Sequence, residues 1–330
     1  MPVARSWLLG GTLAALLSGC GEASKHETIY AAGWEDVGGA SAARLWVDGA
    51  AAALDDGGRP SLATGVAISE GGDVYVSGGV AGTTVDVATC WKNGAAIPLT
   101  DGTFQAFAEA IAVSGSDVYV VGYEGPVAML WRNGVAVALT DGTDDANARS
   151  VAVSGTDVYV AGFEYQTVEI GPSSFFTISV ATIWKNGVAT RLAGSTLARG
   201  VASGGGDVYA AGDVAGVATL WMNGTPSALT DGVFGALATS VAVAGTDVLA
   251  GGGESNGNVD VAKVWRNGVP MDLTSGLSQA FVEAVLATGW HVYAAGYTGS
   301  TAVYWVDGSP VFLTSGGSEA DVRSIAVVEQ

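Results

Sequence analysis

A repeated module runs through almost the whole chain and constrains its fold more than any other feature. Seven copies follow one another at spacings of 40 to 50 residues, and each combines a Tyr-x-x-Gly segment with a later Trp that precedes a turn. The tyrosine positions hold Tyr30, Tyr75, Tyr119, Tyr159, Tyr209, Leu249 and Tyr293. The tryptophan positions hold Trp46, Trp91, Trp131, Trp184, Trp221, Trp265 and Trp305. Periods of this length indicate a solenoid, a propeller or another repeat architecture.

Each copy contains four short apolar stretches, which predict four strands named A to D in chain order. In the fourth copy these are Ser150–Ser154, Asp157–Gly162, Ser179–Lys185 and Val188–Leu192. Strands C and D are joined by Asn186-Gly187, and Asn-Gly between apolar runs is a strong hairpin signal because a type I′ turn needs positive φ at both positions. Each copy is therefore predicted to be a four-stranded antiparallel meander.

The size of the residues along each module predicts how the modules pack. The strands are apolar at nearly every position, which is typical of a sheet covered on both faces. Strand A is built from small residues that fit where sheets converge on an axis. Strand C carries the Trp, which fills a wider gap with roughly 150–250 Å² of surface. These features predict an all-β protein, a seven-bladed β-propeller with four-stranded antiparallel blades.

The first and last copies are incomplete in complementary ways. The repeat region starts with a strand B at Thr28–Gly33 and ends with a lone strand A at Ser324–Val328. Together they predict one composite blade, in which the C-terminal strand pairs with the N-terminal blade and closes the ring. Closure of this kind removes exposed sheet edges. We therefore assign residues 28–330 to a single propeller domain.

The Tyr-x-x-Gly segments and the third-strand Trp residues resemble those of bacterial propeller-repeat proteins and, more loosely, of the kelch propellers, over residues 28–328. This resemblance implies the architecture and places ligand binding on the face that carries the B–C and D–A loops. It implies no activity, because propellers serve as enzymes, lectins and scaffolds alike.

The N-terminal segment predicts a targeting signal. Residues 1–19 combine Arg5 with a short apolar run and resemble a lipoprotein signal peptide. The segment Leu17-Ser18-Gly19-Cys20 resembles the bacterial lipobox, which implies acylation of Cys20, for example with palmitate, and membrane attachment in the cell envelope. Residues 20–27 would form a lipidated tether. In a Gram-negative bacterium, the Gly after Cys20 implies the outer membrane. The alternative is a plain secretory signal with an incidental Cys.

The charge balance excludes a nucleic-acid partner. Thirteen Lys and Arg stand against 32 Asp and Glu, which gives a net charge of −19, whereas nucleic acids are bound through clusters of Lys and Arg. The sequence contains no phosphate-binding loop, no nucleophile elbow and no zinc-protease motif. Catalysis finds no support, and we expect neither a cofactor nor a metal. Cys90 replaces an aliphatic residue, which predicts a buried thiol.

One acidic position recurs just before the tyrosine position, as in Asp73, Asp117 and Asp157, and His291 replaces it in the last full copy. The Asp follows a Gly-containing turn, so we predict that it hydrogen-bonds the backbone of its own turn.

Acidic and aromatic residues recur where strand B meets the B–C loop. The acidic members are Glu35, Glu124, Glu164 and Glu254, and the aromatic members are Trp34, Tyr123, Phe163 and Tyr297. Around a ring, such residues bind sugars or cations by stacking, hydrogen bonds and cation–π contacts. The alternative is a solvated rim copied with the repeat.

A second ring precedes strand A and has charges of mixed sign. We predict that it lines the mouth of the channel, pairs internally and has a structural role. Its members are Thr64, Glu109, Arg149, Arg199, Thr239, Glu283 and Arg323.

The fourth copy carries an insertion, Tyr165–Ile178, that predicts a hairpin extending strands B and C outward. Phe175 and Phe176 near its tip predict either an exposed interaction site or packing over a neighbouring loop.

These features favour a non-catalytic binding lipoprotein of the cell envelope that recognises a glycan or a protein partner through the loop face. The first alternative is a scaffold or assembly component of the envelope, which would use the Phe175–Phe176 hairpin. The second is a propeller polysaccharide lyase or hydrolase, which would require a pair of carboxyl groups with raised pKa on the loop face.

Overall fold

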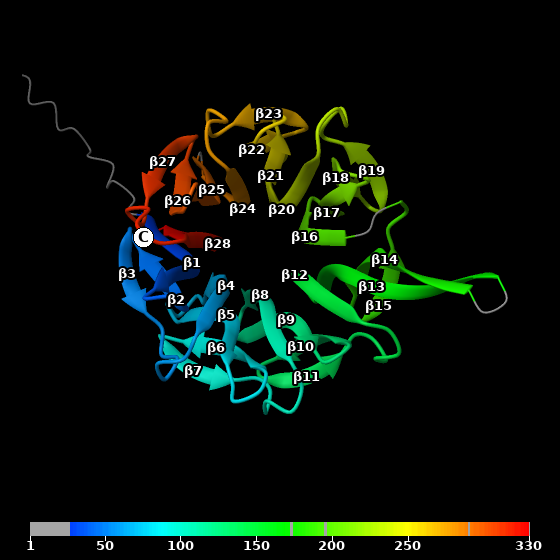
Figure 1. Ribbon diagram of the computed structural model, residues 1–330, viewed down its shortest axis with the longest axis horizontal. Helices are drawn as coiled ribbons and strands as arrows, with labels where there is room; N and C mark the ends of the chain where they lie inside the picture. Colours follow the sequence, from blue (N-terminus) through cyan, green and yellow to red (C-terminus); the bar gives the residue numbers. More distant parts are fainter. Residues whose placement is uncertain (1–26, 172–173, 195–196, 290, 330) are drawn as a thin grey trace, which may run out of the picture.

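A computed structural model describes residues 27–171, 174–194, 197–289 and 291–329. Within these ranges every regular element is a β-strand, so no helix there is long and apolar enough to cross a membrane. The strands form seven four-stranded antiparallel sheets arranged as blades around a central axis (Figure 1). The predicted seven-bladed β-propeller is therefore confirmed. The predicted signal peptide and Cys20 lie outside the described residues.

We keep the letters A to D for the four strands of each blade, counted outward from the axis. The A strands are β28 (Ala320–Glu329), β4 (Ser61–Ile68), β8 (Ala106–Ser114), β12 (Ala146–Ser154), β16 (Leu197–Gly204), β20 (Ala236–Ala244) and β24 (Ala280–Thr288). The B strands are β1 (Glu27–Val37), β5 (Val74–Ala81), β9 (Asp117–Glu124), β13 (Asp157–Gly171), β17 (Asp207–Val214), β21 (Asp247–Ser255) and β25 (His291–Thr298).

The C strands are β2 (Ala40–Val47), β6 (Asp86–Lys92), β10 (Val127–Arg132), β14 (Ser174–Lys185), β18 (Val217–Met222), β22 (Asp260–Arg266) and β26 (Thr301–Val306). The D strands are β3 (Ala50–Ala53), β7 (Ala95–Pro98), β11 (Val135–Ala138), β15 (Val188–Arg191), β19 (Thr225–Ala228), β23 (Val269–Asp272) and β27 (Ser309–Phe312). Blades are numbered in chain order, so blade 1 is β28-β1-β2-β3 and blade 7 is β24-β25-β26-β27.

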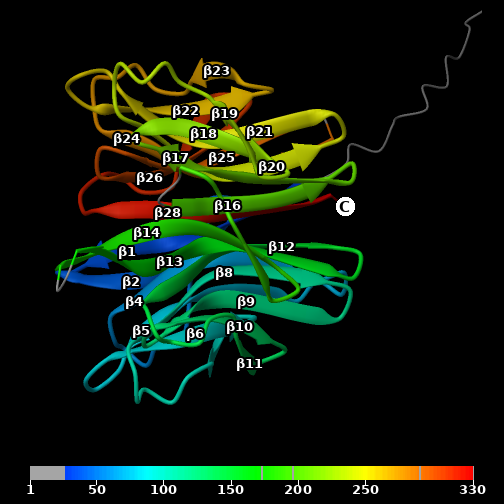
Figure 2. The ribbon, with the colours of Figure 1, turned by 90° about the vertical axis from the view of Figure 1, so that its right-hand side faces the viewer.

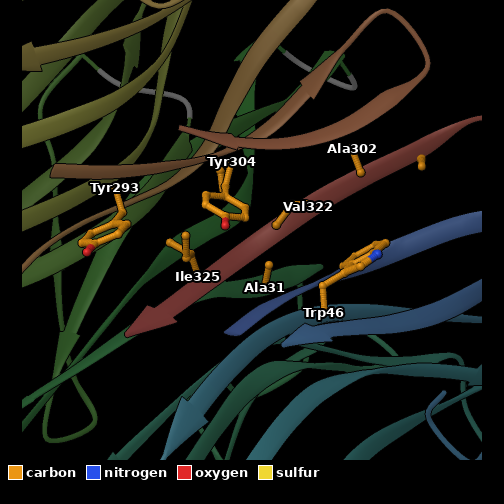
Figure 3. Close-up of a cluster of buried hydrophobic side chains, with 9 residues drawn as sticks. Ala31, Trp46, Tyr293, Ala302, Tyr304, Val322 and Ile325 are labelled. Atoms are coloured by element: carbon orange, nitrogen blue, oxygen red, sulfur yellow. The ribbon is translucent and has the colours of Figure 1, made fainter. Parts of the chain in front are cut away.

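Blade 1 closes the ring as predicted. The C-terminal β28 pairs antiparallel with the N-terminal β1, from Glu27 opposite Glu329 to Glu35 opposite Ala320. Figure 3 shows Val322 and Ile325 of β28 in the core between blades 7 and 1, in a cluster with Tyr304. The two ends of the propeller are therefore joined by both backbone hydrogen bonds and apolar packing.

The third-strand tryptophans form the outer core between neighbouring blades. All seven are at most 1% exposed, and each lies in a cluster that includes apolar residues of the preceding blade. The indole Nε1 of Trp91 donates a hydrogen bond to the backbone oxygen of Asp55 at 2.7 Å. By contrast, Trp131 has a buried Nε1 with no hydrogen-bond partner among the described residues.

This difference predicts unequal effects of the same substitution. Trp91→Phe removes a buried hydrogen bond and leaves the backbone carbonyl group of Asp55 without this donor, whereas Trp131→Phe removes a donor that has no partner among the described residues. We expect Trp91→Phe to lower the free energy of unfolding by about 1–3 kcal/mol more than Trp131→Phe does. Urea unfolding of both variants measures the difference, and equal losses would contradict it.

Each A strand contains a β-bulge at the same place. The register against strand B shifts at Thr64 in blade 2, at Glu109 in blade 3 and at the equivalent residue of each other blade. These residues are the members of the predicted second ring, and a bulge re-aims the side chain of its extra residue.

The same bulge explains the Gly of the Tyr-x-x-Gly segment. A Cβ atom on Gly122 would overlap the backbone carbonyl oxygen of Phe107 on the adjacent A strand. The other six blades show the same close approach, at Gly33, Gly78, Gly162, Gly212, Gly252 and Gly296. The glycine is therefore required by the approach of two backbones.

Cys90 is a free, buried thiol on β6, as predicted. Burial raises its pKa to about 12, which leaves it protonated and unreactive at neutral pH.

Candidate functional site

The two ends of the blades carry different kinds of connection, and they lie at opposite ends of the strands in Figure 2. On one face the B–C loops and the D–A loops are joined by backbone hydrogen bonds, such as Gly125 N to Gln105 O at 2.8 Å and Gly299 N to Gln279 O at 2.7 Å. We call this the loop face. The other face holds the A–B and C–D turns.

On the turn face, the recurring Asp binds residues of the C–D turn, a contact that we call the clasp. It shows that one prediction was wrong. The recurring Asp before the tyrosine position does not bind its own turn: Asp73 accepts hydrogen bonds from Asn93 Nδ2 at 2.8 Å and pairs with Lys92 Nζ at 2.8 Å. Asn93 in turn accepts a hydrogen bond from Val74 N at 2.9 Å. The prediction was wrong about the partner because the C–D turn, which supplies it, lies about 20 residues further along the chain.

His291 forms the inverted version of this clasp. Its Nδ1 lies 2.6 Å from Asp307 Oδ2, and Asp307 occupies the place of the turn Asn. The hydrogen bond and the charge of Asp307 raise the pKa of the His291 imidazole. His291 therefore belongs to the turn face and to the stability of blade 7, away from the loop face.

The predicted second ring surrounds the axis. Its seven residues line one cavity of about 110 Å³. The ring pairs internally in part, since Arg149 Nη1 lies 3.1 Å from Glu109 Oε1. Burial and the nearby charge of Arg149 lower the pKa of Arg199, whose buried Nε has no hydrogen-bond partner among the described residues.

Three of the four acidic residues predicted at the loop face form ion pairs within their own blade. The cations stand on strands C or D beside them. The pairs are Glu35 with Arg44 at 3.2 Å, Glu164 with Arg191 at 3.6 Å and Glu254 with Lys263 at 3.1 Å. These carboxylates therefore have a structural partner at the edge of the blade.

Glu124 differs from the other three. Burial, and secondarily the charge of Asp101, raise the pKa of its carboxyl group.

The four predicted aromatic residues are brought together in two pairs from neighbouring blades. Trp34 of blade 1 and Tyr297 of blade 7 line a cavity of about 510 Å³ together with Gln279, Ser300 and polar residues of blade 1. We call it the first aromatic cavity. Burial raises the pKa of the Tyr297 hydroxyl.

The second aromatic cavity lies between blades 3 and 4. Tyr123 and Phe163 line a space of about 320 Å³ with Tyr165 and Asn147. Phe163 is 8% exposed and packs edge-on against Tyr165, with ring centroids 5.3 Å apart. Arg149 lies over the Phe163 ring, with 5.9 Å between its guanidinium carbon and the ring centroid. The predicted ring thus forms two local aromatic cavities.

Each aromatic cavity contains a buried polar residue that was not predicted as a site. Asp321 is 4% exposed and Asn147 is 6% exposed, and the Oδ1 atom of each is buried with no hydrogen-bond partner among the described residues. The signal is present in the sequence: five of the seven copies have Leu or Phe at this position, and only these two have a polar residue.

The carboxyl group of Asp321 is strongly perturbed. Burial raises its pKa, although the charge of Arg323 opposes the rise. Arg323 Nε lies 2.6 Å from Asp321 Oδ2. The other raised carboxyl group, that of Glu124, stands on blade 3, so these two residues do not form the pair that a hydrolase requires.

The insertion of blade 4 is a hairpin, as predicted. β13 and β14 remain paired out to Gly171 opposite Ser174 and project beyond the ring (Figure 1). Phe176 is 44% exposed, whereas the side chain of Phe175 lies outside the described residues.

Some apolar side chains of the D–A loops are more exposed than Phe176. Leu277 is 87% exposed, Val233 70% and Phe104 57%. The loop face thus presents apolar tips around its polar cavities.

A metal site finds no support in the described ranges, where no group of three or more His, Cys, Asp or Glu side chains is placed to hold an ion.

Comparisons with known proteins found only low similarity. No protein-family model matches the chain, and no curated protein matches it. The crystal structure of Sqt1 from Chaetomium thermophilum has a TM-score of 0.41 and 11% identity, over 81% of this chain and 87% of its own. The crystal structure of the tricorn protease has a TM-score of 0.29 and 10% identity, over 79% of this chain and 31% of its own. The propeller assignment rests on the strand order of this chain itself.

Proposed function

We propose that the protein is a non-catalytic binding protein that recognises a glycan through its loop face. The observation that carries the proposal is the first aromatic cavity, where Trp34 and Tyr297 from two blades face a common space of about 510 Å³. Sugar rings stack their C–H faces on aromatic side chains, and their hydroxyl groups need polar partners. This cavity supplies both.

The polar lining suits a neutral saccharide. Gln279 and Ser300 offer neutral donors and acceptors, Arg323 and Asp321 offset each other's charge, and Glu319 adds one acidic group. The net charge of −19 disfavours a polyanionic glycan through long-range repulsion.

Binding is tested with immobilised cellohexaose, mannohexaose, xylohexaose and chitohexaose. Trp34→Ala and Tyr297→Ala are each expected to weaken binding of the recognised sugar by about tenfold, because each removes a stacking face. Phe312→Ala, on the outer strand β27 with 60% exposure, is the matched control and is expected to bind normally. The proposal fails if the wild-type protein binds none of these glycans, or if both cavity variants bind as well as the control.

A second candidate function is docking of an envelope protein, as in a scaffold. Three exposed apolar side chains on separate D–A loops favour it, because exposed apolar surface is a common feature of interaction sites: Leu277, Val233 and Phe104. The exposed Phe176 on the hairpin adds to this set.

We further propose that the chain is a lipoprotein of the cell envelope, anchored through Cys20. The segment Leu17-Ser18-Gly19-Cys20 supports this proposal, and several acyl chains together give stable anchoring. Cys20→Ser is expected to move the protein from the membrane fraction to the soluble fraction. Mass spectrometry of the wild-type protein provides the check, and an unmodified Cys20 would refute the proposal.

A further inference from the structure

The members of the second ring, which line the channel, are called the channel residues. Two places before each of them lies a repeated position between blades, which we call the seam position. Its seven occupants are Leu62, Phe107, Asn147, Leu197, Leu237, Phe281 and Asp321. A Cβ atom on Gly79 of blade 2 would overlap the ring of Phe107 in blade 3, and one on Gly253 of blade 6 would overlap Phe281 in blade 7. At these two seams the phenylalanine therefore packs against strand B of the preceding blade.

At two seams a large residue faces the smallest possible one. Phe107 and Phe281 each face a glycine. By the same repeat geometry, Leu62 faces Trp34, and Leu197 faces Phe163. An aromatic residue on strand B is thus accommodated by a leucine in the next blade.

The two tyrosines break this pattern. Tyr297 faces Asp321, and Tyr123 faces Asn147, and each pair lines one aromatic cavity. A leucine at these positions would fill space between the blades. The polar residues instead leave a cavity and bury an oxygen atom without a protein donor.

These buried oxygens are costly, and the fold does not require them. A buried acceptor without a partner carries a desolvation penalty. Blade 5 shows that a leucine at the seam position is compatible with an arginine at the channel position, since Leu197 stands two places before Arg199. The two polar seam residues stand in the same relation to Arg323 and Arg149. Because this desolvation penalty occurs at two equivalent positions, each beside an aromatic cavity, it indicates that a ligand binds there.

Each side chain makes a polar contact through its other polar atom, and its buried Oδ1 has no hydrogen-bond partner among the described residues. Asp321 accepts the guanidinium of Arg323 with Oδ2, at 2.6 Å. Asn147 donates from Nδ2 to Glu109 Oε1 at 3.0 Å. In each case a residue of the channel ring orients the seam residue.

We propose that Asp321 and Asn147 are the hydrogen-bond acceptors of two equivalent saccharide subsites, one in each aromatic cavity. The recognised group is a donor, a sugar hydroxyl or the N–H of an acetamido substituent, placed while the sugar ring stacks on the neighbouring aromatic residues. This inference rests on the proposed glycan-binding function and adds the recognition residues and a second subsite on the far side of the channel.

The binding test uses the same four immobilised hexasaccharides with Asp321→Leu, Asn147→Leu and the double variant. Each single variant is expected to weaken binding of the recognised sugar about tenfold, and the double variant to abolish it. Asp321→Asn keeps an acceptor oxygen and converts the first subsite into the type seen at Asn147, so it is expected to retain binding within about threefold, a difference of about 0.65 kcal/mol.

A second measurement needs no ligand. Asn147→Leu introduces the residue that stands at three of the other six seam positions, and it keeps the ion pair of Glu109 with Arg149 while removing the hydrogen bond from Asn147 to Glu109. Because it also removes a buried acceptor without a donor among the described residues, the midpoint of thermal unfolding is expected to rise by about 2 °C or more. A fall in the midpoint would assign Asn147 a structural role and overturn the inference.

The outcomes separate the two proposals. If the wild-type protein binds none of the four glycans, the proposed function fails, and the inference that rests on it fails too. If the wild-type protein binds and Trp34→Ala does not, while Asp321→Leu and Asn147→Leu bind normally, the glycan function stands and the subsite inference is overturned.

Discussion

Deletion of residues 324–330 is expected to abolish cooperative unfolding of the propeller. The deletion removes most of β28, and with it the partners of Glu27–Ala32 on β1. It also removes Ile325 from the core between blades 7 and 1, and the Ser324 hydroxyl that accepts a hydrogen bond from Val66 N of blade 2 at 3.1 Å. The ring would open and expose strand edges that promote aggregation.

Thermal unfolding followed by circular dichroism, with light scattering for aggregation, measures this effect. A variant lacking residues 21–26, which precede β1, is the control and is expected to unfold like the wild-type protein. An unchanged melting transition in the C-terminal deletion would show that ring closure does not depend on β28.

Gly122→Ala is expected to lower the free energy of unfolding by at least about 3 kcal/mol, at the upper end of the range for overpacked cores. The added Cβ would overlap the carbonyl oxygen of Phe107, which is a backbone atom and cannot rotate away. Relief requires a shift of β8 against β9, and β8 also lines the channel.

Gly235→Ala is the matched control for this prediction. Gly235 lies in a D–A loop outside the left-handed region, and a Cβ atom there would meet nothing within 4 Å. Its effect is expected to stay within about 0.5 kcal/mol of zero, as for other open surface positions. Urea unfolding compares the two variants, and similar losses would refute the backbone-contact explanation of the glycine.

Several features of the candidate site could be predicted from the repeat alone. Equivalent positions in a ring of equivalent blades must lie at equivalent heights, so Arg149, Glu109 and the other members of the second ring were correctly placed around the channel. The same reasoning placed Trp34 and Tyr297 on the loop face.

Other features depend on contacts between segments that are distant in the sequence. The partner of Asp73 is Asn93, across the blade, and the local turn suggested a different one. The pairing of Glu35 with Arg44 depends on the register of β1 against β2. A local pattern does not specify either contact.

The seam residues Asp321 and Asn147 were missed although the sequence shows them to be exceptions. In the sequence, a polar residue on a strand is unremarkable. Its meaning depends on the tyrosine of the preceding blade and on the burial of its oxygen, and both follow only from the packing of one blade on the next.

The sequence by itself determined the number of blades, the four strands of each and the closure of the ring, because hydrophobic period, turn residues and residue size are repeated seven times and each copy supports the others. Only the tertiary structure decided where side chains from different blades meet. Contacts between segments distant in the sequence set three features: the spacing of the two aromatic pairs, the ion pairs of the acidic residues and the burial of the two oxygen atoms. Short-range sequence patterns carry no information about these contacts.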